Sequence, residues 1–120
     1  MRPQAQYFPE LYNYDTPAAN AGWGADYIDV ASFFSIFRSF DDHNFAMYNN
    51  PTYDKLVEEA EQQATAEARW DKFVEAEKVL VDDTVIIPIY QRGATVLVKP
   101  YVKGYKVNTV SPEVYYKYIS

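Results

Sequence analysis

The sequence Asn49-Asn50-Pro51-Thr52-Tyr53 marks the start of the clearest helix in the chain. Asn50 can accept hydrogen bonds from the first free backbone N–H groups, and Pro51 suits the first helical position because its φ is already helical. Apolar side chains then recur at helical spacing, with glutamates between them. The apolar positions are Tyr53, Leu56, Val57 and Ala60, and the glutamates are Glu58, Glu59 and Glu61. This pattern predicts an amphipathic helix that begins at residue 51.

A second amphipathic helix is predicted over residues 66–82, after a break near Thr65. Its expected buried side consists of Trp70, Phe73, Val74 and Leu80. The connection to the preceding helix is short, and short connections join helices that pack as antiparallel neighbours. The two helices should therefore form a hairpin with a shared apolar interface.

A third helix is predicted upstream, over residues 31–40. Phe33, Ile36, Phe37 and Phe40 follow the spacing i, i+3, i+4 and i+7 and would share one face. Asp29 is well placed to cap this helix. A polar loop, residues 41–44, should connect it to the helix that begins at residue 51.

Downstream of the helices, the sequence predicts strands. Residues 85–90 are β-branched and apolar, although Pro88 confines the segment to an edge, an end or a crossing between two parts of a protein. Residues 94–98, 105–107 and 114–119 are three further candidates. Helices combined with these strands indicate an α/β protein whose helices pack on a mixed sheet.

Composition limits the possible functions. The 120 residues fit one domain with a real core, and their net charge of −6 is unsuited to nucleic-acid phosphates, so we expect no nucleic-acid partner. The charge is uneven, because residues 93–120 carry four lysines and one glutamate. We therefore expect a boundary near Gly93 that separates residues 1–92 from residues 93–120.

The sequence offers no catalytic constellation. His43 is the only histidine and there is no cysteine, so neither a zinc site nor a nucleophile–base pair can be assembled. No glycine-rich phosphate loop is present, since Gly22 and Gly24 lack the companion residues of such loops. No apolar run is long enough to span a bilayer, and residues 1–6 do not resemble a signal peptide. We expect a binding protein without cofactor or metal, and no enzyme.

The segment Gly22-Trp23-Gly24-Ala25-Asp26-Tyr27 combines a rigid aromatic wall with a nearby carboxylate. In one interpretation Trp23 is buried and Asp26 caps a helix. In the other, the segment is a recognition surface where an ammonium group meets Asp26 through a charge-assisted hydrogen bond. Trp23 and Tyr27 would then add apolar or cation–π contacts. Tyr90 could face the same region or belong to a strand in the core.

Four pieces of sequence, in order, resemble family 5 extracellular solute-binding proteins, the peptide receptors of bacterial ABC importers. The first is the Gly22–Tyr27 segment, and the second runs from Tyr48 to Leu56. The third is Trp70 with Glu75-Ala76-Glu77, and the fourth joins residues 87–90 with residues 98–105. The resemblance covers residues 14–119 and is strongest to the oligopeptide-binding branch.

The resemblance implies that the chain is the C-terminal portion of a much larger two-lobed protein of the type II periplasmic-binding-protein fold. Residues 1–92 would belong to the second lobe, and residues 93–120 would return toward the first. The parent would be an extracellular or periplasmic lipoprotein that delivers oligopeptides to a membrane permease. By resemblance, Asp26 would pair with the ligand's α-amino group and Trp23 would line a side-chain pocket. Gly24 stands where the family has a small residue.

One position departs from the family pattern. Some members carry an arginine three residues before the motif tryptophan, where it meets the carboxylate of a short peptide, and this chain has Asn20 there. Longer peptides are therefore expected. Two alternatives remain open: the same fold with another solute, such as a dipeptide, a nickel complex or a sugar, or a non-binding oligomerising fragment. Exposed strand edges in an isolated fragment would favour a homodimer or strand swap.

Overall fold

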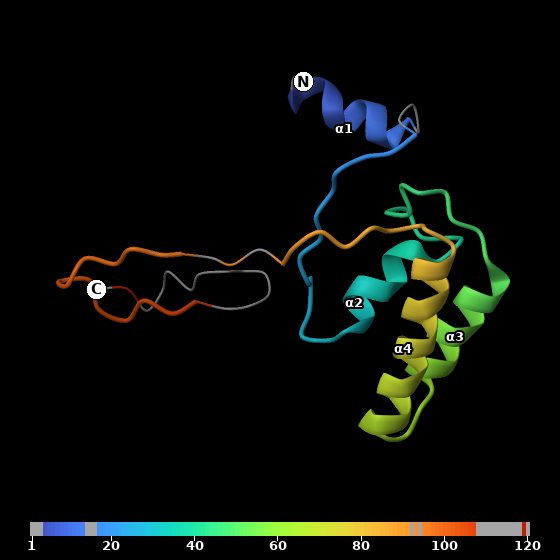
Figure 1. Cartoon of the computed structure of the whole chain (residues 1–120). Coiled ribbons are helices and arrows are strands. Elements are labelled where there is room, and N and C mark those ends of the chain that lie inside the picture. The colour runs from blue at the N-terminus through green and yellow to red at the C-terminus, as the bar shows by residue number, and fades with distance from the viewer. Residues whose placement is uncertain (1–3, 14–16, 92, 94, 108–118, 120) are drawn as a thin grey trace.

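The computed structural model describes residues 4–13, 17–91, 93, 95–107 and 119. Its elements in chain order are α1 (Gln4–Tyr12), α2 (Ala31–Phe34), the 3-10 helix η1 (Ser35–Phe37), α3 (Pro51–Glu61) and α4 (Ala66–Asp82). Helices α2, α3 and α4 form one packed unit, which we call the helical unit. Helix α1 stands apart from this unit, and residues 95–107 run away from it (Figure 1).

Helices α3 and α4 form the predicted hairpin and hold most of the core (Figure 1). Helix α3 buries Tyr53, Val57 and Ala60 against Phe73, Ala76 and Leu80 of α4. The Tyr53 side chain is fully buried, and its hydroxyl donates to the backbone carbonyl of Phe34 at 2.7 Å. That hydrogen bond ties α2 to the hairpin, so the three helices share one core.

The predicted helix starts are confirmed. Asn50 Oδ1 accepts from the backbone N–H of Thr52 at 2.9 Å and of Tyr53 at 3.4 Å. Thr65 caps α4 in the same manner, accepting from the N–H of Ala68 at 3.3 Å. Each side chain satisfies donors that the first helical turn leaves free, which fixes where the helix begins.

The helix predicted over residues 31–40 ends early. The helical conformation stops at Phe37, and Arg38 is extended, with φ −67° and ψ 145°. Side chains bind the backbone where the helix would have continued, since Asp54 accepts from the Ser39 N–H at 3.0 Å and Asn44 donates to the Arg38 carbonyl at 3.1 Å. Phe40 is consequently 70% exposed and does not extend the apolar face.

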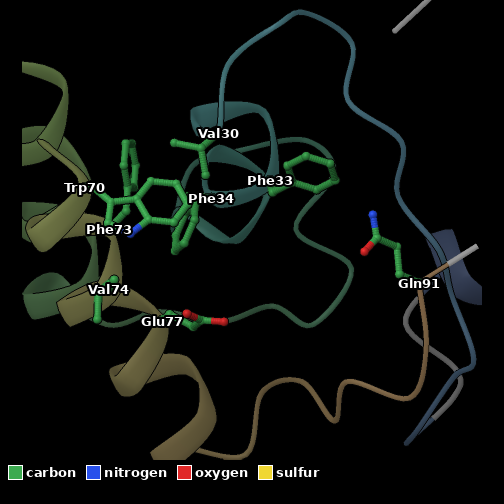
Figure 2. Close-up of a pocket in the computed structure, with 8 residues that line it drawn as sticks. All are labelled: Val30, Phe33, Phe34, Trp70, Phe73, Val74, Glu77 and Gln91. Atoms are coloured by element: carbon green, nitrogen blue, oxygen red, sulfur yellow. The ribbon is translucent and has the colours of Figure 1, made fainter. Parts of the chain in front are cut away.

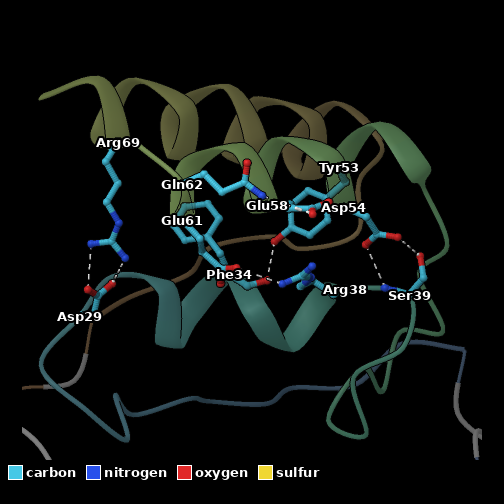
Figure 3. Close-up of polar contacts among 10 residues, drawn as sticks. All are labelled: Asp29, Phe34, Arg38, Ser39, Tyr53, Asp54, Glu58, Glu61, Gln62 and Arg69. Carbon is cyan, nitrogen blue, oxygen red and sulfur yellow. Dashed lines mark hydrogen bonds and ion pairs between the residues drawn. The ribbon is translucent and has the colours of Figure 1, made fainter. Parts of the chain in front are cut away.

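Four polar contacts hold the α2–η1 segment on the hairpin (Figure 3). Besides the Tyr53 hydroxyl on Phe34, the Ser39 hydroxyl donates to Asp54 at 2.6 Å and Arg38 pairs with Glu61 at 3.2 Å. The fourth is a two-pronged ion pair between Arg69 of α4 and Asp29, which lies just before α2. The contacts lie along the whole α2–η1 segment, so both of its ends are fixed.

Trp70 was expected on the buried side of α4, and this is wrong: its side chain is 59% exposed. Phe73, Ala76 and Leu80 face α3, whereas Trp70 is turned away from that interface toward α2 (Figure 2). Tryptophan at this position has the right periodicity for a helix, but periodicity alone does not say which apolar face meets the partner helix.

The predicted mixed sheet is not confirmed. Residues 85–91 are extended but form no strand, and Ile87 and Ile89 are 75% and 73% exposed. Residues 95–106 also form no strand, and Val107 takes part only in an isolated bridge. Ala94 and residues 114–118 of the predicted strands lie outside the described residues. An extended segment becomes a strand only beside a hydrogen-bonding neighbour, and the described residues provide none here.

The molecule is open in shape. Its radius of gyration is 17.8 Å, with extents of 53 × 45 × 22 Å, whereas a compact domain of this length has about 13–14 Å. Within the described part of the chain, no helix has the length and apolar character needed to cross a bilayer.

Candidate functional site

The candidate site is the exposed segment that leads from α1 into α2, residues 17–28. It forms neither helix nor strand. Its path is fixed by three hydrogen bonds: the Tyr7 hydroxyl donates to the Asn20 carbonyl, the Asp26 N–H donates to Ser32 Oγ at 3.0 Å, and the Asp29 N–H donates to the Tyr27 carbonyl at 2.8 Å. The segment is therefore held at both ends while most of its side chains face solvent.

Trp23 is partly buried at the middle of this segment. Its ring meets the His43 ring edge-on, with centroids 5.1 Å apart and planes at 62°. The indole Nε1 is inaccessible to solvent and has no hydrogen-bond partner among the described residues. An unpartnered buried donor is costly, so Trp23 retains an unused capacity to bind an acceptor.

Space is open on both sides of Trp23. A Cβ placed on Gly22 or Gly24 would meet no atom within 4 Å. Neither glycine is therefore required by packing within the described structure, and the backbone at these positions is accessible to a ligand. This accessibility fits the recognition interpretation of the segment better than a buried structural role.

The two aspartates near the start of α2 have different roles. Asp29 accepts from the Ala31 N–H at 2.8 Å and from both terminal nitrogens of Arg69, at 2.6 and 2.8 Å (Figure 3). Chiefly because of the hydrogen bonds from Arg69, the pKa of Asp29 is lowered, and its charge is satisfied within the protein. Asp29 therefore binds the first N–H of α2 as expected, although Val30, which makes no side-chain hydrogen bond, is the residue directly before the helix.

Asp26 is the other aspartate, and its carboxylate binds no group among the described residues. The residue is exposed, and only its backbone N–H forms a hydrogen bond, to the buried Ser32. Its carboxylate makes no ion pair or hydrogen bond with any residue that the structure describes. The interpretation of Asp26 as a helix cap is therefore wrong, because the carboxylate of Asp29, and not that of Asp26, accepts a backbone N–H of α2. Within the described structure, no group neutralises the Asp26 charge.

The other predicted site residues are only partly brought together. Tyr27 follows Asp26 on the same segment and is 49% exposed, and Asn20 contributes its backbone carbonyl to the Tyr7 contact. Tyr90 is 73% exposed and forms no hydrogen bond or ring contact with Trp23 or Asp26. The structure therefore places Trp23, Gly24, Asp26 and Tyr27 on one segment and leaves Tyr90 outside this group.

Several supporting residues were not predicted. Ser32 is buried and receives the Asp26 N–H, and Asn44 is buried with hydrogen bonds to the Arg38 and Tyr48 carbonyls and from the Tyr48 N–H. Asn44 thereby holds the loop that carries His43 against the Trp23 ring. No periodic or spacing signal marks such residues, although an isolated polar residue in an apolar stretch, as Ser32 is, suggests a buried hydrogen bond.

A polar cluster joins the start of α3 to the end of α4. The Tyr48 hydroxyl donates to Asp83 Oδ2 at 2.5 Å, and Asn50 Nδ2 donates to the same oxygen at 2.9 Å. Burial and the Asp83 carboxylate raise the pKa of Tyr48 to about 12, and the two donors lower the pKa of Asp83. This cluster fixes the point at which the chain leaves α4.

Comparison with known proteins identifies the type of protein. The chain is 40% identical over 97 residues to the periplasmic oligopeptide-binding protein OppA of Haemophilus influenzae, a match that covers 81% of this chain and 18% of the relative. It is 38% identical over 88 residues to the periplasmic murein peptide-binding protein MppA of Escherichia coli, covering 73% of this chain and 16% of the relative. No protein-family model matches the chain.

A solved structure shares the fold. The substrate-binding domain of an oligopeptide ABC transporter from Bacillus anthracis superposes with a TM-score of 0.85 at 30% identity, covering 99% of this chain and 24% of that chain. The fold is thus that of a solute-binding protein. More particularly, the chain belongs to the family 5 extracellular solute-binding proteins and is a portion of such a protein, as its motifs predicted. It spans less than a quarter of the length of these relatives.

Proposed function

We propose that this chain supplies the amine-recognising wall of an oligopeptide receptor that serves an ABC importer. The observation that carries the proposal is the contrast between the two aspartates: Asp29 is neutralised by Arg69, whereas the exposed Asp26 carboxylate is unpaired within the described structure. The names of the relatives, which bind oligopeptides and murein peptides, support the same ligand class.

The peptide would be recognised through non-covalent contacts alone. The α-ammonium of a peptide would donate to the Asp26 carboxylate, and the charge on both partners strengthens that hydrogen bond. The accessible backbone at Gly24 would admit the peptide main chain. Trp23 and Tyr27 would cover the first side chain. No bond is made or broken, so we propose a binding protein and no enzyme.

The residue at position 20 bears on the length of the peptide that the receptor would bind. The resemblance places an arginine there in receptors that grip the carboxylate of short peptides, and a neutral amide lacks that charge. Asn20 is exposed, and its backbone carbonyl is held by Tyr7. We therefore assign longer oligopeptides, recognised by the amino end, to this receptor.

The parent architecture is part of the proposal. Residues 1–92 would lie in the second lobe, and residues 93–120 would return toward the first, with Pro88 in the crossing. The exposure of Ile87 and Ile89 supports this arrangement, because apolar side chains on an extended segment fit a strand in a larger sheet. The complete receptor would be held at the outer cell surface or in the periplasm by a lipid anchor and would dock on a membrane permease.

The test uses a full-length receptor that contains this sequence. Asp26→Asn should weaken binding of a tetrapeptide with a free amino end by about 1–3 kcal/mol, roughly five- to 150-fold, because it removes a charged hydrogen bond. The same substitution should hardly change the affinity for the N-acetylated tetrapeptide. Isothermal titration calorimetry measures all four affinities.

A matched control is Asp42→Asn, which removes the charge of an exposed aspartate in the loop before His43. It should leave both affinities unchanged and so corrects for the loss of one overall negative charge. Equal weakening of the free and acetylated peptides by Asp26→Asn would refute the assignment of Asp26 to the amino group.

A further inference from the structure

The Trp23 indole has little support from its own segment. Residues 17–28 form neither helix nor strand, and the hydrogen bonds that fix this segment lie on either side of Trp23. The two glycines that flank Trp23 leave its backbone free to take up many conformations, and a Cβ on either would meet no atom within 4 Å. Within the described structure, the orientation of the indole therefore depends on a contact from another part of the chain.

That contact is made by His43, 20 residues further along the chain. The two rings meet edge-on with their centroids 5.1 Å apart, an arrangement that the charge distribution of aromatic rings favours. No other ring contact of Trp23 occurs among the described residues. The His43 side chain is 52% exposed, so burial in the core is not what holds it at this position.

The His43 ring is itself fixed from two sides. Asp41 Oδ1 accepts from the His43 backbone N–H at 2.8 Å and lies 3.1 Å from Nδ1 of the ring. Because an ionised carboxylate can only accept, Nδ1 carries the proton of the neutral imidazole, and Nε2 is the atom that gains a second proton. On the other side, the Phe45 ring lies edge-on to His43 at 6.4 Å. His43 can therefore act as a firm support for Trp23.

The charged residues around His43 are acidic. They are Asp41 and Asp42 of its own loop, Asp26 of the segment 17–28, and Glu10 of α1, whose end meets that loop. Arg38, the described cation nearest in sequence, is paired with Glu61. A protonated His43 would gain attraction to Asp41, and it would lie within the range of about 6 Å for cation–π attraction to the indole. Protonation would therefore strengthen both contacts that fix the two rings.

We propose that His43 is a positioning residue for the peptide site: it orients the Trp23 indole, more firmly when it is protonated, and thereby raises the affinity for the peptide. This inference rests on the proposed function, in which Trp23 covers the first side chain of the peptide. An indole that is already oriented loses less freedom when the peptide binds, so more of the contact energy appears as affinity. His43 acts through Trp23 and not through Asp26.

The first experiment is a double-mutant cycle in a full-length receptor that contains this sequence. His43→Ala should weaken binding of a tetrapeptide about two- to tenfold, the range for immobilising one side chain. The factor should be the same for the free-amine and the N-acetylated tetrapeptide, because Asp26 is not involved. In a Trp23→Ala background, His43→Ala should change the affinity by less than about 1.5-fold. Isothermal titration calorimetry measures these affinities, and Asp42→Ala, an exposed neighbour of His43, should leave them unchanged.

The second experiment uses His43→Phe, which keeps a ring but cannot be protonated. At about pH 7.5 this variant should recover most of the affinity that His43→Ala loses. Histidine is the side chain whose charge ordinarily changes between about pH 5 and 8. The affinity of the wild type relative to His43→Phe should therefore rise about two- to fivefold between about pH 7.5 and about pH 5.5. Taking this ratio cancels the titration of the amino group of the peptide.

Nuclear magnetic resonance provides a readout that needs no ligand. In a full-length receptor with isotope-labelled tryptophan, Trp23→Phe identifies the indole N–H signal of Trp23. That N–H is inaccessible to solvent, which slows its exchange with water and keeps the signal observable. The chemical shift should change between about pH 5 and 8 in the wild type and stay constant in His43→Phe.

Three results would overturn the proposal. One is an equal loss of affinity for His43→Ala with and without Trp23, and another is a titration of the Trp23 signal that persists in His43→Phe. The third is a loss of affinity confined to the free-amine peptide, since His43 would then act on the amino group. A receptor that binds neither peptide would instead refute the proposed function, and the resonance titration would still decide whether His43 positions Trp23.

Discussion

The helical unit and the segments that flank it differ in how far their side chains are buried or held by polar contacts. Helices α2, α3 and α4 bury a common core, and polar contacts such as Arg69 with Asp29 fix their relative positions. Residues 17–28 and 85–91 instead expose Ile28, Ile87 and Ile89 almost as fully as free peptides would. We therefore expect the stability of the chain to reside in the helical unit and its ligand contacts to reside in the flanking segments.

The same difference separates two aspartates only three residues apart. The Asp29 carboxylate, at the start of the helical unit, accepts three hydrogen bonds, while the Asp26 carboxylate, in the flanking segment, has no partner among the described residues. A change in the helical unit should therefore alter stability, and a change in the flanking segments should alter binding.

Phe73→Ala should have the largest effect on stability. Phe73 is 1% exposed and contacts both Phe34 and the Arg69 guanidinium, so its truncation leaves a cavity in the centre of the core. We expect the free energy of unfolding to fall by about 3–5 kcal/mol. Tyr90→Ala, in the flanking segment, should change it by less than about 0.5 kcal/mol. Urea unfolding followed by circular dichroism measures the unfolding free energy of both variants. Equal losses would refute the division between a stabilising helical unit and flanking segments that add little stability.

Arg69→Met should have an intermediate effect. It removes both hydrogen bonds to Asp29 but keeps the length of the side chain, and both partners are 29% exposed. We expect a loss of about 1–2 kcal/mol. Arg69→Lys retains the charge without the two-pronged geometry, so its loss should lie between that of Arg69→Met and the wild type. A lysine variant as unstable as the methionine variant would show that charge contributes nothing at this position.

The Asp29–Arg69 pair also predicts a dependence on pH. The folded-state pKa of Asp29 is lowered by Arg69, whereas the unfolded value is about 3.9. Because the folded pKa is the lower one, the stabilisation is fully present above about pH 5 and is lost as the pH falls through the folded pKa. The difference in unfolding free energy between the wild type and Arg69→Met should therefore shrink below about pH 4. A difference that is constant down to pH 2 would contradict this account.

Thr84→Gly should have the smallest effect, and it should be stabilising. At the end of α4 the Val85 N–H donates to the Leu80 carbonyl and the Thr84 N–H to the Val81 carbonyl, both at 3.0 Å. This termination places Thr84 at φ 56°, a left-handed conformation that suits glycine and strains a β-branched residue. We expect a gain of about 0.5–1 kcal/mol. Thr84→Ala should gain clearly less, since alanine keeps a Cβ in the left-handed region.

The parts of the fold that local rules determine were predicted well. Asn50 and Pro51 define the start of α3 through capping and a fixed φ, and the span 66–82 of α4 follows from its cap and its periodicity. The predicted strand over 85–90 failed because a strand depends on a neighbour that local sequence does not specify. The prediction for Trp70 failed because periodicity does not specify which apolar face of α4 meets α3.

For the candidate site too, the sequence predicted only what depends on neighbouring residues. Trp23, Gly24, Asp26 and Tyr27 could be proposed because they are adjacent in sequence. The Arg69 partner of Asp29 lies 40 residues away, and Asn44 reaches Trp23 only through the loop that carries His43. Such contacts are set by tertiary packing, so the availability of Asp26 became evident only when the structure showed that Asp29 is the paired residue.

The most direct test of the division measures two quantities for one variant of a full-length receptor that contains this sequence. For Asp26→Asn, we expect an unfolding free energy within about 0.5 kcal/mol of the wild type and an affinity for a free-amine tetrapeptide that is lower by roughly five- to 150-fold. The contradicting result would be a fall of more than about 1 kcal/mol in unfolding free energy with the peptide affinity unchanged. Asp26 would then be a structural residue like Asp29.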